Sequence, residues 1–150
     1  MVLSGKTNIN PLIWGPKFWD VFHFTAFGYP ENSTDDDKEV YKQFYVNFFK
    51  VLPCDACTNS SQEIFNATNL DNATNLDNAL VSRQDLIKWT YDFHDKVNVK
   101  LGKKSPNFEN FVSNFTSRDN WYNISVPIVI VILVILIIIF LIMRYTLNIL

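Results

Sequence analysis

The only two cysteines of the chain, Cys54 and Cys57, stand two residues apart. A C-x-x-C pair can close a small disulfide ring and reopen it, which is the chemistry of thiol–disulfide exchange. Pro53 directly precedes the pair and suits the start of a helix. If Cys57 falls in the first turn of that helix, unpaired backbone N–H groups and the helix dipole stabilise a thiolate there. The pair is therefore a candidate redox centre.

The pair alone leaves two other interpretations open. It could be half of a zinc site, although zinc prefers four ligands and the chain has no second cysteine pair. His23 and His94 each lie more than 30 residues from the nearer cysteine, which is not the ligand spacing of a zinc finger. The cysteines could also be two unrelated core residues. We predict no metal site.

Length and composition restrict the other classes of function. A chain of 150 residues allows one domain. Its net charge is -2 and it has no block of basic residues, which argues against nucleic acid as a partner. Aromatic residues make up 15% of the chain and can fill an ordinary single core. Two cysteines cannot build a disulfide framework, so the pair is reactive, structural or incidental.

Residues 124–143 form an uncharged run made almost wholly of Ile, Val, Leu and Phe. At about 1.5 Å per residue, a helix of this length crosses a bilayer core of about 30 Å. We therefore predict a C-terminal transmembrane helix. The first residues contain no apolar run of signal-peptide length, and Arg144 alone follows the span whereas three cations lie before it. We expect a single-pass, tail-anchored protein whose larger domain faces the cytosol.

Periodic apolar residues and helix-boundary signals divide the rest of the chain into helices. Trp14-Gly15-Pro16 is expected to open the first helix, with Pro16 at its first position, and Pro30 to end it. Ser33 or Thr34 can cap the second helix. The third helix is expected to begin at the cysteine pair and to end near Phe65.

Ser82 and Asp85 resemble a capping box that opens the fourth helix, and Gly102 would end it. A short fifth helix would begin at Ser105-Pro106. The inward positions of the fourth helix are expected to be Leu86, Trp89, Phe93, Val97 and Leu101. Residues 66–77 are the hexapeptide Asn-Ala-Thr-Asn-Leu-Asp written twice, which we interpret as a duplication in a surface loop.

The sequence thus predicts an all-α fold: a four-helix bundle plus a short fifth helix, followed by a C-terminal transmembrane helix. Its expected parts are an N-terminal extension (1–13), a helical domain (14–118), an interfacial linker with Trp121 and Tyr122 (119–123), the membrane span (124–143) and a short tail (144–150).

Two of the predicted helices carry residues that could bind a cofactor. Trp19 and His23 lie one turn apart on the first helix, and His94 and Asn98 lie one turn apart on the fourth, followed by lysines. If the bundle brings these faces together, they form a slot lined by flat rings, amide groups and cations. Such a slot suits a planar ring and a pyrophosphate. Beside a dithiol, the most useful dinucleotide is a flavin, bound here without a Rossmann glycine loop.

Three separated blocks of the sequence resemble the Erv/ALR flavin-linked sulfhydryl oxidases. This family consists of helical-bundle enzymes that bind FAD and oxidise protein thiols with O2. The blocks span residues 14–103 in the order of the family, and small membrane-anchored members occur in large DNA viruses. The matching blocks are Trp14-Gly15-Pro16 with Trp19-x3-His23-x2-Ala26-x2-Tyr29-Pro30, then Pro53-Cys54-x2-Cys57, then Trp89-x4-His94-x2-Val97-Asn98-x2-Leu101-Gly102-Lys103.

The resemblance implies roles for individual residues. Cys57 would be the cysteine next to the flavin, and Cys54 the one that substrate attacks. Trp19, His23 and Phe27 would line the flavin, His94 and Asn98 would hold the adenosine half, and Lys100 and Lys103 would lie near the phosphates. Asp95 stands where the family usually has Asn. The other expected cofactor positions are Trp14, Gly15, Lys17 and Val97.

The resemblance also implies a reaction and partners. Protein thiols would reduce the cysteine pair, directly or through a thioredoxin-like carrier, and the electrons would pass through flavin to O2, giving H2O2. A homodimer is implied as well. The chain has none of the extra cysteines that staple the bundle or shuttle electrons in many members. The alternative function is a non-enzymatic, tail-anchored helical interaction protein whose cysteines are structural or bridge two chains.

Overall fold

The computed structural model describes residues 5–70 and 75–147, and every regular element within them is helical. This confirms the predicted all-α fold. The chain divides into two compact units, Met1–Phe108 and Glu109–Leu150. The helices are α1 (Pro11–Phe27), α2 (Asp35–Phe48), the short 3-10 helix η1 (Phe49–Val51), α3 (Asp55–Leu70), α4 (Leu76–Ala79), α5 (Arg83–Lys100) and α6 (Phe108–Leu147).

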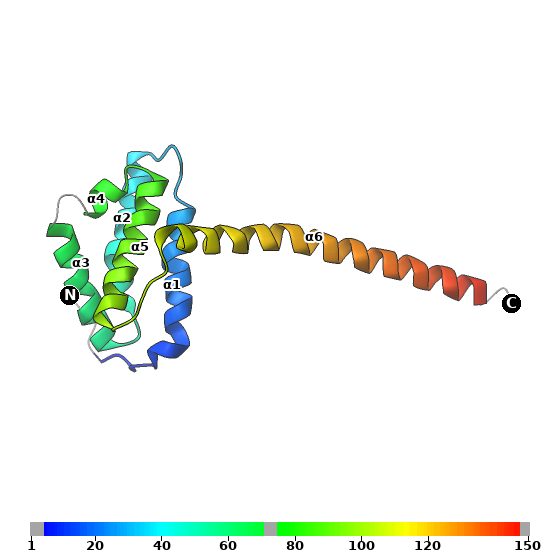
Figure 1. The fold of residues 1–150 in the computed structure, drawn as a ribbon, viewed down its shortest axis with the longest axis horizontal. Coiled ribbons are helices and arrows are strands. Elements are labelled where there is room, and N and C mark those ends of the chain that lie inside the picture. The colour runs from blue at the N-terminus through cyan, green and yellow to red at the C-terminus, as the bar shows by residue number, and fades with distance from the viewer. Residues whose placement is uncertain (1–4, 71–74, 148–150) are drawn as a thin grey trace. The chain divides into compact units, whose positions relative to one another are not determined.

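The first unit is a bundle in which α1, α2, α3 and α5 run alongside one another (Figure 1). Helix α5 packs against α1, α3 and α4, and η1 packs against α2 and α3. The short helix α4 lies at the end of the bundle where α3 finishes (Figure 1). Four helices with short connections bury one common core, as predicted for a chain of this composition.

Helix α1 begins at Pro11, before the predicted start at Trp14-Gly15-Pro16. Asn10 caps it, because its side chain accepts a hydrogen bond from the Leu12 amide, and Pro11 rather than Pro16 occupies the first helical position. Pro16 lies inside the helix, and the helix ends at Phe27, with Gly28 as its C-cap, instead of continuing to Pro30. The prediction missed the Asn-Pro start signal and used the later proline.

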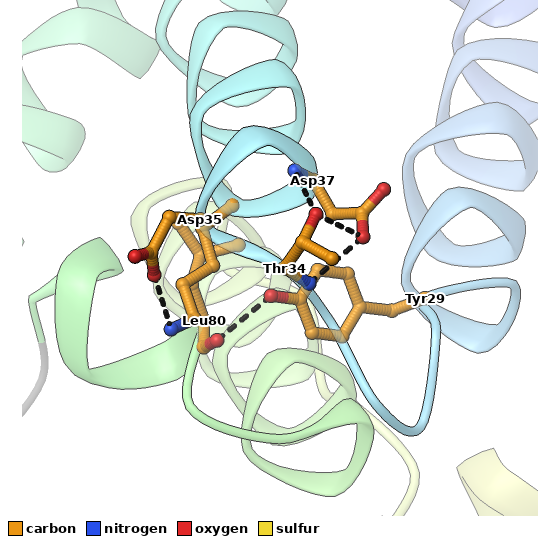
Figure 2. Close-up of polar contacts among 6 residues, drawn as sticks. Tyr29, Thr34, Asp35, Asp37 and Leu80 are labelled. Atoms are coloured by element: carbon orange, nitrogen blue, oxygen red, sulfur yellow. Dashed lines mark hydrogen bonds and ion pairs between the residues drawn. The ribbon is translucent and has the colours of Figure 1, made fainter.

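The start of α2 and the neighbouring turn are fixed by side-chain hydrogen bonds (Figure 2). Thr34 accepts from the amide of Asp37, and Asp37 accepts from the amide of Thr34, which confirms Thr34 as the cap and adds a full capping box. The hydroxyl of Tyr29, which is fully buried, donates to the carbonyl of Leu80 at 2.8 Å. This bond ties the end of α1 to the segment that precedes α5.

The start and stop predicted for α5 are confirmed, but one of its inward positions is not. Ser82 accepts from the amide of Asp85, and Gly102 has a φ of 69°, a left-handed conformation that favours glycine after a helix. Leu86, Trp89 and Phe93 are buried and Val97 is half-buried, as expected. Leu101 is 62% exposed. Helix α5 ends at Lys100, so the helical spacing that placed Leu101 on the inward face no longer applies to it.

The prediction of a surface loop over residues 66–77 is wrong for the described part of that segment. Helix α3 continues past Phe65 to Leu70, and the second copy of the hexapeptide contributes to α4. Asn75 caps α4 by accepting from the amide of Asn78, and Leu76 is buried. Residues 71–74 lie outside the described residues.

The predicted short fifth helix and the membrane span form one continuous helix, α6. No glycine or proline stands between residue 108 and Pro127 to interrupt it. Within α6, Ser125–Tyr145 is long and apolar enough to cross a membrane, by its length and composition. The side chains of Trp121 and Tyr122, predicted to form an interfacial aromatic belt, lie outside the described residues.

The centre of the bundle is a cluster of aromatic rings around Phe22, a fully buried residue of α1. Phe22 lies within 6 Å, ring centre to ring centre, of rings from α1, α2, η1 and α5. Aromatic pairs at these separations add stabilisation beyond their buried area. The rings that surround Phe22 are Trp19, His23, Tyr45, Phe48, Phe49, Trp89 and Phe93.

Candidate active site

Cys54 and Cys57 form a disulfide at the start of α3, with their Cα atoms 5.2 Å apart. Cys54 directly precedes the helix, and its sulfur accepts a hydrogen bond from the amide of Cys57 at 3.2 Å. Cys54 therefore occupies the capping position, where a helix offers its free N–H groups. Cys54 is 9% exposed, whereas Cys57 is half-buried. The predicted helix start at the pair is confirmed.

The segment of residues 5–10, called here the N-terminal strap, holds the loop before the disulfide in place. The amide of Ile9 donates to the carbonyl of Pro53, and Asn8 Oδ1 accepts from the amide of Asp55, both at 2.9 Å. Lys6 Nζ donates to the carbonyl of Lys50 and to the hydroxyl of Thr58. Local patterns in the sequence give no signal for these contacts, because they join residues more than 40 positions apart.

Replacing Asn8 with alanine should lower the free energy of unfolding by about 1–2 kcal/mol. The variant loses the acceptor for the first amide of α3, and alanine tolerates the φ of 50° at this position less well than asparagine. Chemical denaturation of the full chain in detergent measures the change. Asn32→Ala, on an exposed residue of the α1–α2 connection, is the matched control and should change little. Equal stabilities for the two variants would contradict this role of the strap.

The structure brings together three of the predicted cofactor residues, Trp19 and His23 from α1 and His94 from α5. His23 Nε2 lies 2.8 Å from His94 Nδ1, and the rings of Trp19 and His94 stack with centres 3.7 Å apart and planes inclined by 9°. We call these three residues the ring cluster. The sequence predicted rings facing across an open slot, but these rings stack directly on each other, which flat and partly desolvated faces favour. Trp19 and His94 are half-buried, so part of the ring cluster remains in contact with solvent, whereas His23 is buried.

Burial keeps both histidines of the ring cluster neutral. Desolvation, reinforced by the neighbouring His94, lowers the pKa of His23 to about 3 despite the opposing charge of Asp20. Desolvation is also the main reason why the pKa of His94 falls to about 4, while Asp95 raises it and Lys103 lowers it. Each imidazole therefore carries one ring proton near neutral pH.

These pKa values predict that stability falls as the pH is lowered. Below about pH 6.5 the histidines of the unfolded chain bind protons that the folded chain does not bind, so the free energy of unfolding decreases with decreasing pH. Between pH 7.5 and pH 5 we expect a loss of about 2–4 kcal/mol from His23 and His94 together. The loss would continue until the pH reaches the folded pKa values, about 4 and about 3.

Denaturation at several pH values measures this loss. His94→Gln removes one of the two titrating groups and should reduce the pH dependence by roughly half. Equal stability of the wild type at pH 7.5 and pH 5 would contradict the burial of two neutral histidines.

The predicted residues at the end of α5 have three different surroundings. Asn98 closes the helix end, because its carbonyl accepts from the amide of Lys103 and its side chain donates to Ser105. Asp95 raises the pKa of His94 and Lys103 lowers it, so the charges of both residues act on the ring cluster. Lys100 instead forms an exposed ion pair with Glu63 of α3, 2.8 Å away.

The remaining predicted positions lie elsewhere along α1 and α5. The Trp14 indole donates to the carbonyl of Ile9, so this residue anchors the N-terminal strap. Gly15 has open space where a Cβ would stand, and thus no close approach requires glycine there. Lys17 is exposed, and Phe27 and Val97 are half-buried.

The disulfide and the ring cluster are built on the same core residues. Phe49 of η1 lies five positions before Cys54 and stacks on Phe93, whose ring centre is 4.4 Å away. Phe93 adjoins His94 in the sequence, and Phe22, which also contacts Phe49, adjoins His23. Residues next to the cysteine loop and residues next to the two histidines therefore pack in the same aromatic core.

The residues present fit a flavin dinucleotide. The neutral imidazoles and the indole offer a ring surface, and His94 Nε2 has no hydrogen-bond partner among residues 5–70 and 75–147. Lys17 and Lys103 form no ion pair within the described part of the chain and could meet a pyrophosphate. The disulfide supplies the redox partner that such a cofactor needs.

Comparison with known proteins gives one consistent result. The sequence profile of the Erv1 / Alr family matches residues 16–120. A probable FAD-linked sulfhydryl oxidase of Acanthamoeba polyphaga mimivirus is 38% identical over 96 residues, which are 64% of this chain and 64% of that protein. A putative FAD-linked sulfhydryl oxidase of Invertebrate iridescent virus 6 is 35% identical over 98 residues, 65% of this chain and 86% of the relative. The chain thus covers just under two thirds of the mimivirus protein.

The fold comparison agrees with the sequence comparison. The crystal structure of the yeast Erv1 core superposes with a TM-score of 0.59 and 26% identity, over 74% of this chain and 89% of the Erv1 core. The family profile covers more than half of the chain and includes the disulfide, the ring cluster and the end of α5. The chain therefore belongs to the Erv1 / Alr family.

Proposed function

We propose that this protein is a FAD-linked sulfhydryl oxidase that forms disulfides in other proteins. The observation that carries the proposal is the Cys54–Cys57 disulfide at the start of α3, fixed by a shared aromatic core to two neutral histidines. Family membership and the names of the viral relatives support it. An intrachain disulfide also argues against the alternative in which these cysteines bridge two chains.

The cysteine pair would carry out the exchange step. A substrate thiolate attacks one sulfur of the disulfide, and a second substrate thiolate resolves the mixed disulfide, so the substrate forms its own disulfide and the pair gains two electrons as two thiolates. The amide of Cys57, which hydrogen-bonds to Cys54, would stabilise a thiolate released at Cys54. The attack of substrate on Cys54 rather than Cys57 stays a prediction. The greater exposure of Cys57 favours attack on Cys57 instead.

The cofactor would be held by residues of the ring cluster together with Lys17 and Lys103. FAD, when bound, supplies a two-electron acceptor that returns the cysteine pair to the disulfide and passes the electrons to O2, giving H2O2. Trp19 and His94 would orient its rings, and Lys17 and Lys103 would neutralise its phosphates. Phe27, Asn98 and Lys100 remain proposed contacts.

We further propose that the substrates are protein thiols, reached directly or through a thioredoxin-like carrier, and that the chain forms a homodimer. The apolar segment Ser125–Tyr145 supports a membrane anchor. The predicted cytosolic orientation of the larger domain can be tested by protease protection in sealed membranes.

The proposal is tested with the full chain purified in detergent. After incubation with FAD and removal of free cofactor, the protein should be yellow and should consume O2 when dithiothreitol is added, with H2O2 as the product. A folded protein that binds no flavin and consumes no O2 would overturn the proposal.

A further inference from the structure

A chain of hydrogen bonds runs from the core of α5 to the surface of the ring cluster. The hydroxyl of Thr90 donates to the carbonyl of Ile87 at 2.9 Å, and Thr90 Oγ1 lies 3.2 Å from His23 Nδ1. His23 Nε2 in turn lies 2.8 Å from His94 Nδ1. Thr90 is fully buried and His23 is 1% exposed, so no solvent can replace these partners.

The distances assign the donor and the acceptor in each of these hydrogen bonds. A threonine hydroxyl has a single proton, and the shorter contact assigns it to the carbonyl of Ile87. Thr90 Oγ1 can then only accept from His23, which places the His23 proton on Nδ1. His23 Nε2 is left as an acceptor, so the proton between the two histidines belongs to His94 Nδ1. A neutral His94 with its proton on Nδ1 has a lone pair on Nε2.

We propose that Thr90 is a positioning residue that fixes both histidines as Nδ1–H tautomers, so that His94 presents Nε2 to the cofactor as a hydrogen-bond acceptor. The ligand group that this site recognises is then a neutral donor of the dinucleotide, an exocyclic amine or a ribose hydroxyl. This inference deepens the proposed function and rests on it. His94 is half-buried, and its Nε2 has no other partner among the described residues.

The charged neighbours do not replace Thr90 in this role. Asp20 acts on His23, while Asp95 and Lys103 act on His94 with opposite signs. These charges influence how readily each ring gains a second proton. They do not decide which nitrogen of a neutral ring holds the single proton, because that choice follows from the hydrogen-bond partner of the other nitrogen.

The test determines by NMR which ring nitrogen of each histidine carries the proton. The full chain, labelled with 15N-histidine and purified in detergent without a polyhistidine tag, contains only two histidines. Long-range 1H–15N correlation spectra at pH 7.5 distinguish protonated from unprotonated ring nitrogens, and His94→Gln assigns the signals. The wild type should show both protons on Nδ1. Thr90→Ser keeps the hydroxyl and should show the same pattern.

Thr90→Val has nearly the same shape but offers His23 no acceptor. The protons of both rings should then move, wholly or in part, to Nε2, and FAD should bind about tenfold more weakly because His94 no longer presents an acceptor. FAD affinity is measured by fluorescence titration, independently of turnover. Thr90→Ser should restore both the tautomers and the affinity, which a role in packing alone would not require.

Two results would overturn the inference. One is a wild-type His94 with its proton on Nε2, and the other is a folded Thr90→Val variant with unchanged ring protons and unchanged FAD affinity. If Thr90→Val does not fold, the wild-type and Thr90→Ser spectra still decide the tautomers. Wild-type protein with the expected tautomers but no FAD binding would refute the proposed function and leave the role of Thr90 in the hydrogen-bond chain intact.

Discussion

Replacing Cys57 with serine is expected to lower dithiol-dependent O2 consumption by at least about 1,000-fold. A serine hydroxyl cannot form a disulfide with Cys54, so the pair can no longer accept two electrons from a substrate. Bound flavin should be retained, because the ring cluster of Trp19, His23 and His94 is unchanged. Oxygen-electrode rates and the visible spectrum of the full chain in detergent measure the two properties separately.

The neighbouring residues provide matched controls for this loss. Cys54→Ser should be as inactive as Cys57→Ser, since either change removes the disulfide. Ala56→Ser places a hydroxyl at an exposed position between the cysteines and should leave the rate within about twofold of the wild type. A Cys57→Ser variant that turns over at the wild-type rate would mean that the disulfide is structural.

The largest expected effect on stability follows from Phe22→Ala. Removing a fully buried ring from the centre of the aromatic cluster leaves a cavity and should lower the free energy of unfolding by about 3–5 kcal/mol. Phe22 contacts His23, Phe49 and Phe93, so its loss also loosens the core that relates the cysteine loop to the histidines. We therefore expect FAD affinity to fall together with stability. Denaturant titration and fluorescence titration with FAD measure both.

The adjacent residue Val21 separates this effect from a general weakening of α1. Val21 is 52% exposed, and Val21→Ala should change the free energy of unfolding by less than about 0.5 kcal/mol. A similar loss in Val21→Ala and Phe22→Ala would show that helix propensity, rather than the buried ring, determines the stability of this region.

The elements whose boundaries have local signals were predicted well. The side chains of Thr34 and Ser82 each accept a hydrogen bond from the backbone amide three residues later, and so cap their helices. Gly102 adopts the left-handed φ that follows the end of α5. Such signals lie within one turn and can be read without the fold. The start of α1 was placed at the wrong proline, and the burial of Leu76 in α4 depends on the tertiary core, which no local pattern reports.

The candidate site was predicted in part for the same reason. Periodicity placed Trp19 and His23 on one face of the first helix, and the structure brings them to His94, although their contact with FAD stays a prediction. The N-terminal strap was missed because Asn8 meets Asp55 across 47 positions of sequence. Thr90 was also missed, yet its place one turn before His94 on α5 was a usable signal.

Anaerobic reduction of the bound flavin tests most directly whether electrons pass from the cysteine pair to FAD. Dithiothreitol is added to the flavin-loaded full chain without O2, and the visible absorbance of the flavin is followed with time. The wild type and Ala56→Ser should bleach rapidly, whereas Cys57→Ser should keep its oxidised spectrum over the same period. Bleaching of Cys57→Ser at the wild-type rate would contradict the account, because the flavin would then be reduced without the Cys54–Cys57 disulfide.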